Sequence, residues 1–391
     1  MPIVNRIASF ADDLKEWRRH IHANPELGLE CHETAKFVVE RLREFGVDEI
    51  HENIGVSGVV AILRGQGSGP TTGLRADMDA LPIQEETGVD YSSRIAGRMH
   101  ACGHDGHTTM LLGAARYLAE TRNFAGRVAL IFQPGEEMGD GGKVMCDEGL
   151  MERFDISQVF ALHTTVAFET GTFAMRTGPI MASTDEFEIC ISGNGGHGAY
   201  PHLTSDPVAA ALQLGQALQT IVSRNIPALE NVVVSVTQVQ AGTARNVIPK
   251  QAVLGGTVRS HSTAARSTVK QRFERICAGM AEAMGVDIQL DYIEGVPPTI
   301  NHAPQTALAA EVASEIVGTE NVITDMEPRM GGEDFSFMLE RRPGAYVFIG
   351  QGAGPFPHNP GFNFNDDISS LGASYFARLI ERTQSLEVPQ T

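Results

Sequence analysis

Hydrophobic residues recur at spacings of three and four in several stretches of the chain, which predicts amphipathic helices. In the N-terminal stretch these positions are Ile7, Phe10, Leu14, Trp17 and Ile21. We expect one helix there, ending before Pro25. A second helix is predicted over residues 34–45, because Gly46 is a favoured C-terminal cap. Another is predicted over residues 108–118.

Short apolar runs alternate with these helices and predict buried strands. They occupy residues 59–63, 73–76, 128–132, 158–162 and 346–350. Each run is followed within two residues by Gly, Pro, Asp, Glu or His. Strands that alternate with helices indicate a layered α/β sheet, in which ligands usually bind at the carboxyl ends of the strands. The polar residues of this chain fall at that edge.

Between residues 184 and 297 the pattern changes to strands with one buried face. The apolar residues that alternate with polar ones are Phe187, Ile189, Ile191, Val232, Val234 and Val236. Asp206 followed by Pro207 predicts the start of a helix. Its expected buried positions are Val208, Ala211, Leu212, Gly215, Leu218 and Val222. A further helix is predicted by Val269, Phe273, Ile276, Cys277, Met280 and Met284, followed by Gly285.

Two strand regions and two helices predict a small α+β insert with one sheet face under helices. We therefore expect residues 1–183 and 298–391 to form one α/β domain that residues 184–297 interrupt. The length of 391 residues agrees, because one hydrophobic core seldom serves a chain of that size.

The charge and composition exclude several classes of partner. A net charge of −18 would repel nucleic acid and anionic membrane surfaces. The sequence shows neither an apolar run of about 20 residues, as a membrane span needs, nor the apolar core of a signal peptide near its start. We therefore expect a cytoplasmic protein. The 5 cysteines are widely spaced and form no CxxC pair, so a disulfide framework is not predicted.

The densest cluster of chemically active residues is HACGHDGH, residues 100–107. Cys102 and His104 can turn toward one point from an extended loop, and both residue types bind Zn, Co, Ni or Mn ions. The alternative is a buried cysteine beside surface histidines. Asp77 and Asp79 follow another predicted strand, where we interpret them as hydrogen-bond acceptors that orient a metal-binding histidine.

Two adjacent carboxylates, Glu136 and Glu137, follow the predicted strand at 128–132. One can bind a metal ion while the other takes a proton from water, a division of labour that metal-assisted hydrolysis requires. A solvated acidic loop is the alternative. His163 and His358 also follow predicted strands, although a lone histidine there is more often structural. Together, the candidates that would suffice for two ions are Cys102, His104, Glu137, His163 and His358.

As an ordered set, these motifs resemble the M20 metallopeptidases, in particular the aminoacylase and hippurate hydrolase branch that includes plant auxin-conjugate hydrolases. The resemblance covers nearly the whole chain. The stretches that carry it are WRRHIHANPELGLE (17–30), GLRADMDALP (73–82), MHACGHDGH (99–107), FQPGEE (132–137), ALH (161–163), GGHGAYPH (195–202), ARNVIP (244–249), GGEDF (331–335) and HNPG (358–361).

The resemblance implies a zinc-peptidase-like catalytic domain and an inserted, ferredoxin-like lid that also mediates dimerisation. It implies that Cys102 bridges two divalent ions whose other ligands are His104, Glu137, His163 and His358. Glu136 would be the general base and later the acid. The branch has Cys where other members have a bridging Asp, and Asp77 where others have a ligating His.

Further roles implied by the resemblance fall in the lid. His197 matches a histidine that lies near the substrate carbonyl, often from the partner subunit, whereas its alternative role is that of a turn residue among glycines. Asn246 and Arg259 match positions that contact polar groups of the substrate, and Gly332 with Glu333 would shape the pocket floor. His22 and His107 are interpreted as structural.

The predicted function is metal-dependent hydrolysis of the amide bond of N-acyl amino acids, such as hippurate or N-acetyl amino acids, by a homodimer or larger homo-oligomer. The ions would be Zn, Mn, Co or Ni. The same fold could instead act on N-acetyl-diaminopimelate, an indole conjugate or a small dipeptide. A catalytically silent binding protein is the alternative of another class, and the presence of Glu136 argues against it because binding alone needs no base.

Overall fold

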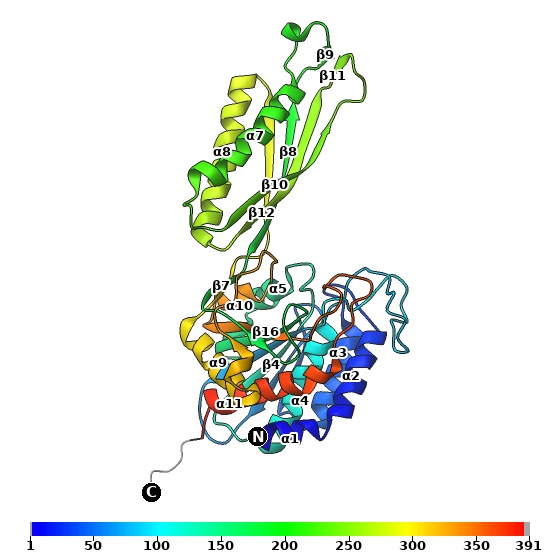
Figure 1. Ribbon diagram of the computed structural model, residues 1–391, viewed down its shortest axis with the longest axis vertical. Helices are drawn as coiled ribbons and strands as arrows, with labels where there is room; N and C mark the ends of the chain where they lie inside the picture. The colour runs from blue at the N-terminus through cyan, green and yellow to red at the C-terminus, as the bar shows by residue number, and fades with distance from the viewer. Residues whose placement is uncertain (1, 387–391) are drawn as a thin grey trace. The chain divides into compact units, whose positions relative to one another are not determined.

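The computed structural model describes residues 2–386, which form two compact units (Figure 1). Within the described residues, the first unit comprises 2–180, 300–327 and 334–386, and the second comprises 181–299 and 328–333. The segment Pro328–Glu333, which we expected in the first unit, groups with the second. A backbone hydrogen bond connects it to the second unit, in which Ala182 N–H donates to the Gly331 carbonyl at 2.9 Å.

A mixed sheet of 8 strands forms the centre of the first unit. In spatial order its strands are β1 (Glu49–Ile54), β2 (Gly58–Arg64), β4 (Arg127–Gln133), β3 (Thr71–Asp77), β5 (Ile156–Thr165), β16 (Gly344–Gly350), β6 (Phe173–Ala174) and β15 (Val322–Ile323). The neighbours β4, β3, β5 and β16 run parallel to one another. Every residue of β3 and β16 is buried, and β16 accordingly is a nearly continuous apolar run in the sequence.

Helices cover this sheet and supply most of the remaining core. They are α1 (Pro2–Ala8), α2 (Ala11–Ala23), α3 (His32–Glu44), α4 (His104–Thr121), α5 (Gly141–Asp147), α6 (Leu150–Arg153), α9 (Ala303–Val317), α10 (Ser336–Leu339) and α11 (Ser369–Thr383), with short 3₁₀ helices at Thr319–Asn321 and Asp366–Ile368. Figure 1 shows α4 beside α11 and α2, and these helices pack against one another. The predicted α/β class is therefore confirmed for this unit.

The N-terminal helix predicted as one piece is two helices. The predicted buried positions are confirmed, because the side chains on the apolar stripe are all buried, namely Ile7, Phe10, Leu14, Trp17 and Ile21. The helix is interrupted because the Ser9 hydroxyl donates to the Arg6 carbonyl at 2.6 Å. Such local side-chain bonds compete with the helical ladder.

The start of α4 also differs from the prediction. We expected an extended loop through Cys102 and His104 and a helix from residue 108, but the helix begins at His104. Gly103 makes this possible, because its φ of 96° is a left-handed conformation that glycine adopts without a steric penalty. A Cβ at Gly103 would also overlap the Thr164 methyl group.

The second unit is an antiparallel α+β structure, as predicted. Its sheet has the order β10 (Val232–Ala241), β12 (Gln251–Ser260), β8 (Ser183–Ser192) and β13 (Asp287–Glu294). The helices α7 (Pro207–Asn225) and α8 (Thr263–Met284) pack side by side on the sheet (Figure 1). A ribbon of β9 (Gly196–His197) and β11 (Val247–Ile248) extends it, next to the 3₁₀ turn Pro201–Leu203. Short strands β7 (Gly178–Met181) and β14 (Thr299–Asn301) pair where the chain passes between the units.

The buried stripe of α7 is rotated from the predicted one. The Asp206 cap is present, since its carboxylate accepts from Val208 N–H at 2.9 Å and Ala209 N–H at 3.2 Å. The buried positions, however, are Pro207, Ala210, Ala211, Leu214, Leu218 and Ile221. Leu212 is 67% exposed. Apolar residues surround most of this helix, so its sequence alone does not select one face.

The helices within residues 2–386 include none that combines the length and the apolar character needed to cross a membrane.

Candidate active site

The parallel strands of the first unit end at one edge of the sheet, and the candidate residues gather there. Asp77 is the last residue of β3, and Glu136 and Glu137 follow β4. His163 lies near the end of β5, and the segment with His358 follows β16. Parallel strands therefore bring together residues that lie far apart in the sequence.

Five side chains named as metal candidates converge at this edge. Cys102 Sγ lies 3.5 Å from His163 Nε2. Glu137 reaches two histidines, with Oε2 3.3 Å from His358 Nε2 and Oε1 3.9 Å from His104 Nε2. Ligand atoms of Cys102, Glu137 and His358 all lie within 4.8 Å of one another. Glu136 Oε2 is 3.8 Å from His104 Nε2, so the second carboxylate borders the same cluster.

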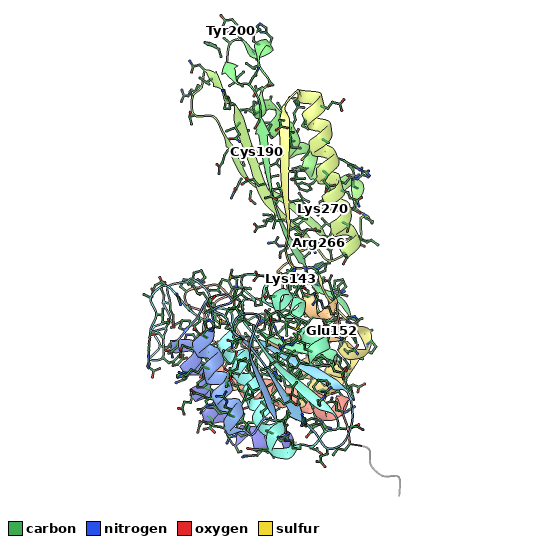
Figure 2. All side chains as sticks on the ribbon, turned by 180° about the vertical axis from the view of Figure 1, so that it is seen from behind. Lys143, Glu152, Cys190, Tyr200, Arg266 and Lys270 are labelled. Carbon is green, nitrogen blue, oxygen red and sulfur yellow. The ribbon has the colours of Figure 1, made fainter. Side chains whose placement is uncertain are left out.

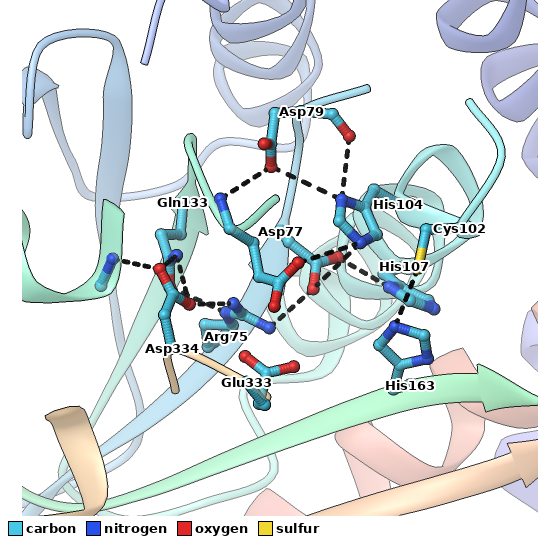
Figure 3. Close-up of polar contacts among 12 residues, drawn as sticks. Arg75, Asp77, Asp79, Cys102, His104, His107, Gln133, His163, Glu333 and Asp334 are labelled. Carbon is cyan, nitrogen blue, oxygen red and sulfur yellow. Dashed lines mark hydrogen bonds and ion pairs between the residues drawn. The ribbon is translucent and has the colours of Figure 1, made fainter. Parts of the chain in front are cut away.

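Asp79 holds three of these residues in place, among them His104, which lies beside it in Figure 3. Its carboxylate accepts from the backbone N–H groups of Glu136 at 3.0 Å and Glu137 at 3.1 Å. Its backbone carbonyl accepts from His104 Nδ1 at 2.8 Å. One buried aspartate therefore fixes the loop of both glutamates and the orientation of one imidazole.

Both buried imidazoles present Nε2 to the cluster. His104 Nδ1 donates to the Asp79 carbonyl, and His163 Nδ1 donates to the Thr164 carbonyl at 2.6 Å. A neutral imidazole whose Nδ1 carries the proton has its lone pair on Nε2. Each ring is therefore prepared to bind a cation through Nε2.

His358 is held by its backbone. Its N–H donates to the Ala101 carbonyl at 2.7 Å, which joins its loop to the segment that carries Cys102. Its φ is 67°, a left-handed conformation that is uncommon for a residue other than glycine. Such conformations persist where surrounding structure enforces them, often at functional sites.

The ionisable groups at this edge are of a kind that a bound cation would stabilise. Burial raises the pKa of the Cys102 thiol well above its usual value, and the Glu137 charge raises it further. Burial also raises the pKa of Glu137, although His104 and His358 oppose this. Among residues 2–386, neither His104 Nε2 nor Glu137 Oε1 has a hydrogen-bond partner, although both atoms are buried. Buried groups of this kind fit divalent cations, which would satisfy both atoms and favour the ionised thiol and carboxyl.

Asp77 and His107 lie next to the cluster but are engaged elsewhere. Ligand atoms of Asp77, His104, His107 and His163 lie within 4.8 Å of one another. However, Asp77 accepts from Arg75 Nη1 at 2.6 Å and from His107 Nδ1 at 2.6 Å. These bonds agree with the interpretation of both residues as supports.

A second buried network lies behind His104. His22 Nδ1 is 2.8 Å from Asp105 and its Nε2 is 3.3 Å from Glu85. Burial alone would lower the pKa of His22, but hydrogen bonds to Asp105 and Glu85 raise it to about 9. Arg18 lies 3.6 Å from Asp105 and donates to Asp366 at 2.7 Å. This charged layer anchors the first turn of α4 to α2.

The candidate residues of the second unit fall into two groups. His197 pairs with Val247 in the β9–β11 ribbon, where Gly198 N–H donates to the Asn246 carbonyl at 2.8 Å. Both His197 and Asn246 are exposed. In contrast, Arg259 pairs with Thr184 on β8, and a Cβ at Gly332 would overlap the Thr184 methyl group. Glu333 is buried nearby, where its carbonyl accepts from Thr299.

These two groups occupy opposite ends of the second unit. Thr184 is near the start of β8, whereas His197 follows the end of that strand. Extended chain rises about 3.3 Å per residue, so β8 alone separates the groups by roughly 25 Å. Figure 2 shows the separation, with Tyr200 at one end of this unit and Arg266 at the other. Tyr200 N–H donates to the His197 carbonyl, and Arg266 binds Asp185, the neighbour of Thr184.

Some of the contacts that support the cluster are not predicted by the sequence. The sequence indicates that Asp79 orients a histidine, but it does not predict the bonds of the Asp79 carboxylate to the Glu136–Glu137 loop. Gln133 and Asp334 bind Arg75 under the site, at 2.9 Å and 2.8 Å. A buried arginine in a strand otherwise made of apolar residues was the available signal, because such a charge requires partners.

Comparisons with known proteins show the family of the chain. The family model for peptidase family M20/M25/M40 matches residues 73–382. Hippurate hydrolase of Campylobacter jejuni is 41% identical over 97% of this chain and 98% of its own length. N-acetylcysteine deacetylase of Bacillus subtilis is 38% identical over 95% of this chain and 97% of its own.

A solved structure shares the fold of the whole chain. It is a Bacillus subtilis protein described as a dinuclear metal binding peptidase from the M20 family. Its TM-score is 0.85 at 34% identity, over 96% of this chain and 99% of that one. The chain belongs to the M20 peptidase family and is an enzyme of its amidohydrolase type.

Proposed function

We propose that this enzyme hydrolyses the amide bond of N-acyl amino acids, releasing a carboxylic acid and a free amino acid. The observation that carries the proposal is the Glu136 carboxylate, whose backbone N–H donates to Asp79 and which lies beside a converging set of thiol, imidazole and carboxylate ligands. Relatives named hippurate hydrolase and N-acetylcysteine deacetylase support this substrate class. Both substrates in those names are amino acids with an acylated nitrogen.

We assign two divalent cations to the cluster. Cys102 would bridge them, and His104, Glu137, His163 and His358 would complete the two sites. Sulfur, imidazole and carboxylate ligands suit Zn, Mn, Co or Ni. When bound, the cations supply Lewis acidity, which lowers the pKa of water and polarises a carbonyl group.

Glu136 moves the proton. Its carboxylate takes a proton from the water that attacks the amide carbon, and a C–O bond forms. It then gives that proton to the amide nitrogen as the C–N bond breaks, so the amino acid leaves as a neutral amine. Asp79 fixes the backbone of residues 136 and 137. The side chain of the base, Glu136, and that of the metal ligand, Glu137, therefore point in different directions. Proton transfer by a positioned side chain typically contributes about 10²–10⁴-fold to the rate.

We assign His197 to stabilisation of the oxyanion and Asn246, Arg259, Gly332 and Glu333 to substrate binding. Since about 25 Å of β8 separates His197 and Asn246 from the other group, one small substrate cannot touch both groups of one subunit. A second copy of the chain would supply the missing group. We therefore infer a homodimer formed through the second unit.

Other amides remain candidates for the substrate, namely N-acetyl-diaminopimelate, an indole–amino acid conjugate or a small dipeptide. They require the same machinery and differ only in the groups that flank the scissile bond. A catalytically silent homologue is disfavoured, because Glu136 is retained and positioned beside the cluster.

A substrate panel tests the proposal. Protein stripped of metal would be reconstituted separately with Zn, Mn, Co and Ni and assayed on hippurate, N-acetyl amino acids, N-acetyl-diaminopimelate, an indole conjugate and dipeptides. We expect metal-dependent release of a free amino acid from hippurate or N-acetyl amino acids. Turnover confined to dipeptides, or absent with every ion, would refute it.

A further inference from the structure

The buried imidazole of His107 connects two strands of the first unit. Its Nδ1 lies 2.6 Å from Asp77 Oδ1 at the end of β3. Its Nε2 lies 2.9 Å from the backbone nitrogen of Thr164 on β5. His107 is fully buried. It lies beside His163 in Figure 3, and the ring centroids of these two histidines are 4.4 Å apart.

The two bonds fix the protonation of this ring. A backbone N–H can only donate, so His107 Nε2 accepts from Thr164 and carries no proton. The proton of the ring lies on Nδ1, which donates to the Asp77 carboxylate. Both nitrogens are therefore occupied, and His107 has no lone pair to offer to a cation.

The Thr164 N–H needs this acceptor because β5 is no longer paired with β3 at this position. The pairing of β5 with β3 ends at Ala161 and Arg75, whereas β5 continues beside β16 as far as Thr165. A buried N–H beyond the last pair would cost free energy if left without a partner. His107, reaching from the first turn of α4, takes the place of the missing strand.

Thr164 in turn orients His163. The Thr164 carbonyl accepts from His163 Nδ1 at 2.6 Å, which directs His163 Nε2 toward Cys102. The Thr164 hydroxyl donates to Gln351 at 3.0 Å. The residue is thus held by its N–H, its carbonyl and its side chain.

The other end of the connection is equally fixed. Asp77 accepts from Arg75, whose Nη2 donates to Asp334 at 2.8 Å. Asp334 also accepts from Gly142 N–H at 2.7 Å, at the start of α5. A continuous chain of hydrogen bonds therefore runs from the segment after Glu136 and Glu137, through Arg75, Asp77 and His107, to Thr164.

We propose that His107 is a positioning residue, which sets the direction of His163 by accepting the Thr164 N–H. The role deepens the proposed function, because it rests on the assignment of His163 as a ligand. Partners of this kind typically change metal affinity or activity by about 10- to 100-fold when removed. The essential feature is the acceptor at the Nε2 position.

Three variants isolate that acceptor. His107→Leu removes both hydrogen bonds, whereas His107→Asn can still donate to Asp77 but does not reach Thr164. His107→Gln is the matched control, because its side-chain oxygen can occupy the position of Nε2 and accept from Thr164. In each protein we would measure amide hydrogen exchange of Thr164 without metal, and the affinity for Co²⁺ by titration with absorption spectroscopy.

We expect exchange at Thr164 to accelerate at least about tenfold in His107→Leu and His107→Asn, and Co²⁺ affinity to fall about 10- to 100-fold. His107→Gln should stay within about threefold of wild type in both measurements. Equal losses in all three variants, or unchanged Thr164 exchange in His107→Asn, would overturn the proposal. If His107→Leu does not fold, the Asn and Gln pair still decides.

The outcome is separable from that of the proposed function. The exchange measurement uses the metal-free protein, so it reports the His107–Thr164 bond whether or not any substrate is hydrolysed. A wild-type protein that binds no Co²⁺ would refute the assigned metal site. A wild type that binds Co²⁺ but hydrolyses no amide would refute only the assigned reaction.

Discussion

At the scale of single residues, the site depends on which atoms are already occupied. The Nδ1 atoms of His104 and His163 donate to backbone carbonyls, so Nε2 of each ring faces the cluster. In His107 both nitrogens are engaged, which distinguishes a supporting histidine from two candidate ligands. Proximity alone does not make this distinction, because all three rings lie together.

Replacing Glu136 with Gln should abolish proton transfer while the metal site is kept. The amide has nearly the same shape but cannot accept the proton of water, so we expect kcat to fall by about 10²–10⁴-fold. Metal stoichiometry should be unchanged. Glu137→Gln is the control, because it should weaken metal binding instead. A Glu136→Gln enzyme with near wild-type kcat would contradict the role of Glu136.

His22 should make the stability of the protein depend on pH above neutrality. Its pKa is raised from the ordinary 6.5 to about 9 by hydrogen bonds to Asp105 and Glu85, against burial and the Arg18 charge. The protonated ring therefore stabilises the fold fully below pH 6.5, and this stabilisation is lost as the pH rises through about 9. The shift corresponds to at most about 3.5 kcal/mol.

The measurement is the free energy of unfolding by urea between pH 6 and 10, for wild type and His22→Gln. We expect wild type to lose more stability over this range than the variant. Parallel curves for the two proteins would show that His22 is not charged in the folded state.

At the scale of elements, the sequence specified the strands well and the helix boundaries less well. The apolar runs at residues 59–63 and 128–132 became β2 and β4, since a strand buried on both faces leaves a continuous apolar signal. The carboxyl end of β4, together with those of its parallel neighbours β3 and β5, also located the candidate site. The predicted start of α4 was wrong because the observed start depends on the φ of Gly103 and on the contact of Gly103 with Thr164. No local pattern encodes such a contact.

Gly103→Ala should therefore destabilise the protein more than the same change at another left-handed glycine. Gly97 is the control, because its φ is 72° and a Cβ there would meet nothing within 4 Å. The left-handed conformation alone should cost about 1–2 kcal/mol at each position. The overlap with Thr164 should add about 1–3 kcal/mol at Gly103. Equal free energies of unfolding for both variants would show that the close contact is absent.

At the scale of the whole molecule, each unit has its own hydrophobic core. The division was visible in the sequence as a change from buried runs to alternating positions. The sequence did not show how far apart the candidate residues of the second unit lie, because the length of β8 sets that distance. Arg259 pairs with Thr184 near the start of β8, whereas His197 follows the end of β8.

Mixing two inactive variants tests whether a second copy completes the site. Glu136→Gln and His197→Ala homodimers should each be inactive or nearly so. After subunit exchange, a mixed dimer contains one site with both wild-type residues, so we expect activity to recover. Mixing Glu136→Gln with wild type is the control, because exchange should leave the total activity of that mixture unchanged. No recovery despite demonstrated exchange would show that His197 acts within its own subunit or not at all.

The most direct test of the account is the anomalous diffraction of crystals grown with Zn²⁺ or Mn²⁺. We predict two peaks at the carboxyl edge of the sheet, bridged by Cys102 and within bonding distance of His104, Glu137, His163 and His358. His107 and Asp77 should bind neither ion. No peak at this edge, or an ion bound by His107 and Asp77, would contradict the account.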